Sequence, residues 1–297
     1  MKKQLLGRTG LLVTQLGYGA MELRGERIWD GRAVTVQQAQ RILIAVLDAG
    51  INFIDTSSDY GLSEELIGQS INKRRNEYYL ATKCGCSMVN KGDHDETPHI
   101  WTKNNLLRNI ESSLTRLKTD YVDVWQLHNP TVAQVEENNL LDVMEQVRSQ
   151  GKTRWIGIST TLPHIKTFLG WKVFDVFQIP YSALQREHEE MITKVAKAGA
   201  GTIIRGGVAQ GEFGISYRAL AERWEKWEKA KLDEFRGPNE SRTAFMLRFT
   251  MMHPYLHTTI VGTLNPQHLA ENLRALQAGP LSQDVYTEVK RRLNELN

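Results

Sequence analysis

Four side chains of this sequence could together move a proton: Asp55, Tyr60, Lys83 and His128. A tyrosine donates a proton poorly near neutral pH, because its unperturbed pKa is about 10. A nearby ammonium stabilises the phenolate and lowers that pKa, and a carboxylate keeps the ammonium charged and in place. A neutral imidazole can orient a carbonyl oxygen. These four residue types therefore suit a proton-relay site for carbonyl reduction, provided that the fold brings them together.

Each of the four residues lies at or just beyond the end of a short apolar stretch. Asp55 and Tyr60 belong to the stretch NFIDTSSDYG at 52–61, Lys83 ends the stretch 78–83, and His128 follows 121–127. Taken singly, Asp55 could cap the following loop, Lys83 could be a solvated strand end, and His128 before Asn-Pro could be a turn histidine. Four such residues at three consecutive strand ends indicate a site.

Strand-like and helix-like stretches alternate eight times from Leu16 onward, with no break in composition. Eight units with strands rich in Val, Ile and Leu predict one closed (β/α)8 barrel, a single domain over residues 1–297. Right-handed crossovers then bring the carboxyl end of every strand to one face. Strands are expected at 16–19, 52–55, 78–83, 121–127, 153–159, 176–180, 201–204 and 258–261, and helices at 36–49, 63–71, 102–117, 140–149, 163–169, 187–197, 241–251 and, as the last, 266–278.

Two elements are expected in addition to the barrel. The turn at 7–10 (GRTG) predicts an N-terminal β-hairpin, which would plug the end of the barrel opposite the chemistry. A charged helix at 217–235 is inserted before the helix at 241–251 and the last strand. Its Trp224 and Trp227, three residues apart, are expected to pack rather than to form a substrate platform.

Composition argues against several classes of function. A net charge of +3 is too small to predict nucleic-acid binding. The two cysteines, Cys84 and Cys86, give no disulfide framework, and no apolar run approaches the length of a membrane span; we therefore expect a soluble, cytoplasmic protein. No metal is expected: no second Cys pair follows Cys84 and Cys86, and loop polarity explains the acidic run at 93–96 with His99.

The sequence resembles the aldo-keto reductase superfamily, the NAD(P)(H)-dependent (β/α)8 oxidoreductases. The resemblance covers nearly the whole chain and rests on the segments 6–10, 17–19, 55–61, 112–128, 157–159 and 262–272. It implies Tyr60 as the general acid, Lys83 and Asp55 as the pair that tunes it, and His128 as the group that orients the substrate carbonyl.

The resemblance also implies a set of cofactor-binding residues. Ser159 and Gln178 match positions that bind the nicotinamide carboxamide, and the loop at 205–211 matches the segment around the pyrophosphate, where glycines expose backbone N–H groups. Arg205 stands where many members place an aromatic residue, and its planar cation can also lie on a ring. The glycine pair at 206–207 could equally be a plain turn. The implied contacts are Gly19, Met21, Asp55, Ser159, Gln178, Arg205, Gly206, Gly207, Val208, Gly211, Gly262, Thr263, Asn265, His268, Glu271 and Asn272.

The resemblance favours NADP(H) and leaves NAD(H) open. Gly262 and His268 stand where many members hold the 2′-phosphate with Lys or Arg, so the preference for NADPH is expected to be modest and to grow as pH falls. The substrate is expected to be a small carbonyl compound or sugar, and the oligomeric state is not predicted. Three functions follow: a carbonyl reductase, a sugar or alcohol dehydrogenase running oxidatively, or a slow cofactor-binding regulatory subunit.

Overall fold

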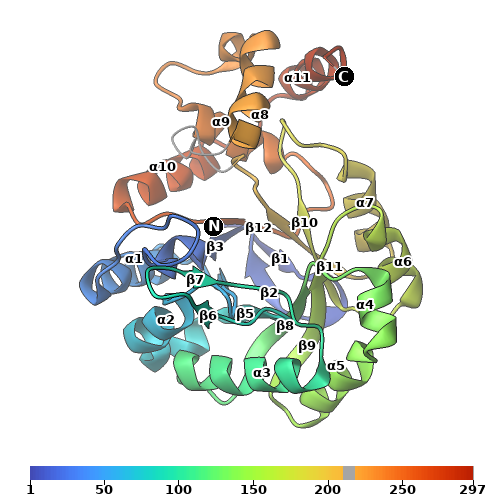
Figure 1. The fold of residues 1–297 in the computed structure, drawn as a ribbon. Coiled ribbons are helices and arrows are strands. Elements are labelled where there is room, and N and C mark those ends of the chain that lie inside the picture. The colour runs from blue at the N-terminus through green and yellow to red at the C-terminus, as the bar shows by residue number, and fades with distance from the viewer. Residues whose placement is uncertain (210–217, 297) are drawn as a thin grey trace.

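The computed structural model describes residues 1–209 and 218–296, and its centre is a closed barrel of eight parallel strands (Figure 1). Each strand pairs in parallel with both neighbours around the ring. The predicted (β/α)8 barrel is confirmed. In barrel order the strands are β3 (Leu16–Gly19), β4 (Phe53–Asp55), β5 (Tyr79–Cys84), β8 (Val122–His128), β9 (Thr153–Ser159), β10 (Val176–Pro180), β11 (Gly201–Arg205) and β12 (Thr258–Val261).

The helices that surround the barrel begin and end close to the predicted residues. Several have side-chain N-caps, such as Thr35, Thr102 and Ser241, whose hydroxyls accept a hydrogen bond from the backbone N–H three residues later. They are α1 (Val36–Asp48), α2 (Ser63–Ile71), α3 (Lys103–Leu117), α5 (Leu140–Ser149), α6 (His164–Trp171), α7 (Glu189–Lys197), α9 (Arg242–Thr250) and α10 (Pro266–Gln277). None of the described helices is long and apolar enough to cross a membrane.

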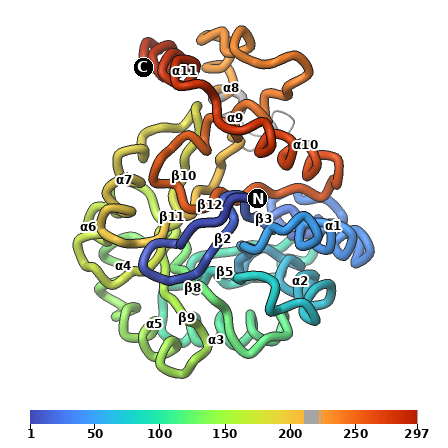
Figure 2. Tube along the Cα trace, turned by 180° about the vertical axis from the view of Figure 1, so that it is seen from behind, coloured from blue at the N-terminus to red at the C-terminus, as the bar shows by residue number. Residues whose placement is uncertain are grey.

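The N-terminal hairpin closes one end of the barrel, as expected. Its strands β1 (Lys3–Leu5) and β2 (Leu12–Thr14) are antiparallel, and the hairpin lies across the barrel in the view from behind (Figure 2). Leu6, Leu11 and Val13 pack on the inward residues of five strands; these are Phe53, Ala81, Val124, Val176 and Ile203. The close approach of the hairpin to β11 requires glycine at position 7, because a Cβ there would lie 2.3 Å from the backbone nitrogen of Gly201.

The inserted helix is present as α8 (Arg218–Lys229), followed by a short 3-10 turn at Leu232–Phe235; position 217 lies outside the described residues. Trp224 and Trp227 are buried, and Trp227 packs edge-on against Phe245, which confirms the packing interpretation. The prediction that the helix at 266–278 is the last was wrong. A further helix, α11 (Gln283–Asn294), lies beside α8 and α9 at one side of the barrel (Figure 1).

Three small elements in the loops that follow β3, β5 and β8 were not predicted. They are a 3-10 turn at Ala20–Arg24, the pair of two-residue strands β6 (Val89–Asn90) and β7 (Asp95–Glu96), and the short helix α4 (Val132–Glu137). All three lie in loops beyond the carboxyl ends of barrel strands, where no apolar periodicity is long enough to mark an element.

Strand alternation places a polar layer directly above an apolar one inside the barrel. Successive side chains on a strand point to opposite faces, so residues two apart share a face. The inward residues Ala81, Val124 and Val176, against which the hairpin packs, are each followed two positions later by Lys83, Gln126 and Gln178. Phe53 is likewise followed by Asp55. The carboxyl ends of the strands therefore carry polar groups into one buried volume.

Gly68→Ala should destabilise the protein. Gly68 lies in α2 against α3, and a Cβ there would lie 2.1 Å from the carbonyl oxygen of Arg116. Because that obstacle is backbone, the two helices must separate, which should lower the free energy of unfolding by about 1–3 kcal/mol. Urea denaturation measures it.

Gly170→Ala is the matched control, because Gly170 also lies in a helix but nothing lies within 4 Å of the added Cβ. Alanine there should be neutral or stabilise by up to about 1 kcal/mol. Equal effects of the two substitutions would contradict the close approach of α2 and α3.

Candidate active site at the carboxyl ends of the strands

A buried ion pair between Asp55 and Lys83 forms the floor of the candidate site. The Lys83 side chain is fully buried, and its Nζ donates to Asp55 Oδ2 at 2.5 Å and to the carbonyl oxygen of Thr56 at 2.7 Å. Asp55 Oδ1 accepts hydrogen bonds from Gln126 Nε2 at 3.0 Å and Gln178 Nε2 at 2.8 Å. Both charges are thus compensated by groups on β4, β5, β8 and β10.

Tyr60 lies directly over this pair. Lys83 Nζ is 4.8 Å from the centre of the tyrosine ring, and Trp29 packs edge-on against the same ring. Burial raises the pKa of Tyr60 above its ordinary value; the Lys83 ammonium opposes this change, and Asp55 and Asp59 reinforce it. The expectation of a lowered pKa was therefore wrong in this structure, because burial outweighs the lysine. Tyr60 is held protonated.

His128 completes the set at the end of β8. Its ring centroid is 6.1 Å from that of Tyr60, and its Nδ1 is 3.3 Å from Asp59 Oδ2. Asp59 is buried, which raises the pKa of its carboxyl, but the opposing charge and hydrogen bond of His128 and the hydroxyl of Ser57 lower that pKa well below the ordinary range. The structure therefore brings all four sequence-predicted side chains to one place.

The residues predicted to contact the nicotinamide border this site. Ser159 is fully buried at the end of β9, beside Gln178 on β10. Among the described residues, Ser159 Oγ and Gln126 Oε1 have no hydrogen-bond partner, although both are buried. Buried polar atoms are nearly always paired. These two offer a donor and an acceptor of the kind that a carboxamide requires.

The segment after β11 forms a tight turn, with the N–H of Ala209 donating to the carbonyl of Gly206 at 2.8 Å. Gly206 has a φ of 69°, and Gly207 admits no side chain because a Cβ would lie 2.4 Å from Thr259 Oγ1. Val208 is buried, Arg205 is half-buried and Gly211 lies outside the described residues.

The remaining predicted cofactor residues gather around the start of α10. Thr263 Oγ1 is 3.4 Å from Nδ1 of His268, which is exposed, and Asn265 caps the helix by accepting from the N–H of Gln267. Gly262 packs on Gly19, whose oxygen would lie 2.4 Å from an added Cβ. The elements that follow β3 and β12 carry the last three predicted residues nearby. Of these, Met21 and Glu271 are half-buried and Asn272 is buried.

Sequence reasoning missed three polar residues of this region. Gln126 supports Asp55, and its position two residues after Val124 and two before His128 could have marked it as inward-facing. Asp59 lies within the stretch 52–61 but was given no role, and Cys86 was set aside as half of an unlikely zinc pair. The acidic run at 93–96 forms ion pairs within loops, among them Asp95 with Arg27 at 2.7 Å.

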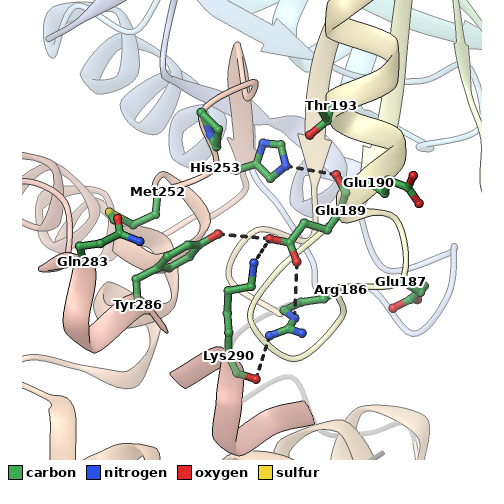
Figure 3. Close-up of a pocket in the computed structure, with 11 residues that line it drawn as sticks. Arg186, Glu187, Glu189, Glu190, Thr193, Met252, His253, Gln283, Tyr286 and Lys290 are labelled. Atoms are coloured by element: carbon green, nitrogen blue, oxygen red, sulfur yellow. Dashed lines mark hydrogen bonds and ion pairs between the residues drawn. The ribbon is translucent and has the colours of Figure 1, made fainter. Parts of the chain in front are cut away.

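A separate open cavity of about 680 Å³ lies between α7, the segment after α9 and α11 (Figure 3). Its main charged group, Glu189, accepts from Lys290 Nζ at 2.6 Å and Tyr286 Oη at 3.3 Å, with Arg186 alongside. None of the sequence-predicted site residues lines it. Because the charges on its wall are already paired, it provides no alternative to the site at the barrel mouth.

Comparisons with known proteins agree with the fold. The model of the aldo/keto reductase family matches residues 15–294. The oxidoreductase YqkF of Bacillus subtilis is 29% identical over 96% of this chain and 94% of its own length. The NADH-specific methylglyoxal reductase of Escherichia coli is 30% identical over 66% of this chain and 64% of its own. The holo form of aldo-keto reductase AKR11C1 from Bacillus halodurans superimposes with a TM-score of 0.84 at 28% identity, covering 98% of this chain and 96% of that one.

This chain therefore belongs to the aldo/keto reductase family, a class of oxidoreductases that use nicotinamide cofactors and act on small carbonyl compounds.

Lys83→Met should destabilise the protein by about 3–5 kcal/mol, because it leaves the Asp55 carboxylate buried without its cation. The double variant Asp55→Asn with Lys83→Met removes both charges and should recover most of that loss. Denaturant unfolding of the four proteins of the cycle measures the coupling. A double variant whose loss equals the sum of the two single losses would contradict a coupled pair.

Proposed function

We propose that this chain is an NAD(P)H-dependent reductase that converts an aldehyde or ketone to the alcohol, with Tyr60 as the proton donor. The observation that carries the proposal is the position of Lys83, which is fully buried, bonded to Asp55 and 4.8 Å from the Tyr60 ring. A buried ammonium beside a phenol stabilises the phenolate that remains after proton transfer.

Each residue has a defined task in this proposal. The nicotinamide, when bound, supplies the hydride that reaches the carbonyl carbon. The phenol of Tyr60 gives its proton to the carbonyl oxygen, so that one C–H and one O–H bond form and the alcohol leaves. Lys83 balances the charge left on Tyr60, and Asp55 holds Lys83 in place. His128, held by Asp59, orients the carbonyl oxygen.

The protonation state of the free site supports this direction of transfer. Burial keeps the pKa of Tyr60 above its ordinary value, so the phenol carries its proton at neutral pH; the Lys83 ammonium, which opposes that rise, stabilises the phenolate as the proton leaves. The carbonyl oxygen becomes strongly basic only as the hydride arrives, so the proton moves when it is needed.

The residues present fit a nicotinamide. The buried Ser159 Oγ and Gln126 Oε1, which lack partners in the described part of the chain, match the acceptor and donor groups of a carboxamide. In the tight turn at 206–209 nothing lies within 4 Å of an added Cβ at Gly206, so a phosphate can approach the backbone closely, and the amino end of α10 presents the positive end of a helix dipole to an anion. We assign the contacts with the pyrophosphate and the adenosine to these two segments.

One panel of substrates tests both the direction of the reaction and the class of substrate. The relative from Escherichia coli is named for the reduction of methylglyoxal, which supports small aldehydes as the first substrates to try. A panel of aldehydes, ketones and sugars, assayed in both directions by nicotinamide absorbance, separates a reductase from an oxidative dehydrogenase. A single burst without steady turnover across the panel would favour a regulatory subunit.

Tyr60→Phe should lower turnover of a good carbonyl substrate by about 10²- to 10⁴-fold, because general acid catalysis typically contributes that much. The ring is kept, so its packing with Trp29 and the affinity for the cofactor should change little. Steady-state kinetics and cofactor fluorescence titration measure the two effects. Near-normal turnover of this variant would overturn the mechanism.

The preference for NADPH should be modest and should increase between pH 8 and pH 6. His268 is the candidate partner of the 2′-phosphate, and an imidazole binds a phosphate more strongly when it is protonated. A charge-assisted hydrogen bond contributes roughly 1.5–3 kcal/mol, or about 10- to 150-fold when fully formed. Dissociation constants for NADPH and NADH at both pH values provide the measurement.

The matched variant is His268→Gln, which keeps a polar side chain but carries no charge. It should show the same ratio of NADH to NADPH affinity at pH 6 and pH 8. A pH-independent preference in the unmodified protein, or preference for NADH at both values, would remove His268 from the phosphate site.

A further inference from the structure

Three potential metal ligands meet beside the candidate active site: Cys86, His99 and His128. One ligand atom from each lies within 4.8 Å of the other two. Cys86 Sγ is 3.6 Å from His128 Nδ1. Of these residues, only His128 has a part in the proposed reduction.

The backbone holds this cluster together. Cys86 and His99 face each other across an isolated antiparallel bridge that closes the loop after β5. The N–H of Ile100 donates to the carbonyl of Gly85 at 2.7 Å, next to that bridge. His128 ends β8, which pairs with β5. The three side chains therefore converge from two strand ends and one loop, as the ligands of a built site do.

The distances suit a tetrahedral zinc-type ion. With a Zn–S bond of about 2.3 Å and Zn–N bonds of about 2.0–2.1 Å, a sulfur and a nitrogen ligand lie roughly 3.5 Å apart. The separation of Cys86 Sγ from His128 Nδ1 is 3.6 Å. His99 must approach by roughly 1 Å to reach the same geometry. It can do so because it is exposed, and its ring contacts are with Trp101, on which it stacks, and with His128 itself, which it meets edge-on.

A buried carboxylate supplies the charge that such an ion requires. Asp59 Oδ2 lies 3.3 Å from Nδ1 of His128, which is itself 3.6 Å from Cys86 Sγ. The nearby cation, Lys83, is already neutralised by Asp55. Thiolate, imidazole and carboxylate are all ligands that zinc accepts, and four of them complete a tetrahedral site.

The spacing of the cysteines in the sequence concealed this site. Gly85, with a φ of 107°, turns the chain between Cys84 and Cys86. The thiol of Cys84 donates to the carbonyl oxygen of Gln126 in the core, 3.4 Å away. Only Cys86 reaches the mouth, where its partners come from distant segments.

We propose that Cys86, His99 and His128, with Asp59 as the fourth ligand, bind a zinc-type divalent cation that reversibly inhibits the enzyme. All four ligands come from the protein, so no position stays open for a substrate, and the ion acts as an inhibitor rather than as a Lewis acid. Binding through His128 removes that imidazole from carbonyl recognition. The site rests on geometry alone, whereas the inhibition also rests on the proposed function.

Cobalt(II) titration of the reduced, chelator-treated protein tests the site without any assay of activity. One Co²⁺ per chain should give the visible bands of tetrahedral cobalt together with a thiolate-to-cobalt charge-transfer band, and Zn²⁺ should displace it. Cys86→Ala should abolish the charge-transfer band. His99→Gln should weaken Co²⁺ binding by at least roughly 10-fold.

Cys84→Ser and His94→Gln are the matched controls. Serine keeps a donor for the Gln126 carbonyl, and His94 lies exposed on the same loop as His99 and pairs with Asp93. Both control variants should bind Co²⁺ like the unmodified protein. No charge-transfer band in the unmodified protein, or the same loss in Cys84→Ser, would overturn the site and leave the cluster as hydrogen bonds alone.

Inhibition is measured on the complex with NADPH, using the best aldehyde of the substrate panel. Zn²⁺ should inhibit turnover, a chelator should restore it, and His99→Gln should require at least roughly 10-fold more Zn²⁺ relative to its own uninhibited rate. Tight Co²⁺ binding without inhibition by Zn²⁺ would overturn the regulatory part of the proposal. If no carbonyl is turned over, the proposed function fails, and the cobalt spectrum still decides the site.

Discussion

The buried ion pair between Asp55 and Lys83 is the interaction on which the rest of the site depends. Removing such charges from water costs several kcal/mol per ion, and the cost is offset only when geometry and hydrogen bonding are good. Here Lys83 donates to Asp55 and to the Thr56 carbonyl, and Asp55 also accepts from Gln126 and Gln178. A hydrophobic pair of equal volume would serve stability as well. In the proposed mechanism the Lys83 ammonium of this pair stabilises the phenolate of Tyr60, whose ring lies over the ammonium.

The barrel supplies this arrangement through the alternation of its strands. An inward apolar layer, sealed from below by the hairpin residues Leu6, Leu11 and Val13, lies beneath the polar layer at the carboxyl ends. The apolar layer keeps water from the ion pair, and burial in turn raises the pKa of Tyr60 and keeps it protonated. The fold and the proposed proton donor, Tyr60, are thus linked by the same packing. Asp59 and His128 form a second pair of a carboxylate and a basic side chain beside the first.

Most of the fold, and the meeting of Asp55, Tyr60, Lys83 and His128 at one place, could be predicted, because strand ends and helical periodicity are local signals. The strands at 153–159, 176–180 and 258–261 have the predicted bounds. Other features depend on tertiary contacts. α11 was missed because Gly279 and Pro280 mark a helix end, although Ser282, Tyr286, Val289 and Leu293 carry a cap and an apolar face. The raised pKa of Tyr60 was mispredicted because the extent of burial cannot be read from spacing. Cys86 meets His99 and His128 only through a turn and a bridge.

Tyr60 stays protonated above the buried ion pair of Asp55 and Lys83. The most direct test of this protonated state is a pH titration of tyrosine labelled with ¹³C at Cζ, followed by NMR, with the Tyr60 signal assigned by its loss in Tyr60→Phe. Tyrosine ordinarily ionises near pH 10. The Tyr60 resonance should remain that of the neutral phenol at pH 8 and at pH 9 and should shift only above about pH 10. A resonance that reports phenolate at pH 8 would contradict the protonated state.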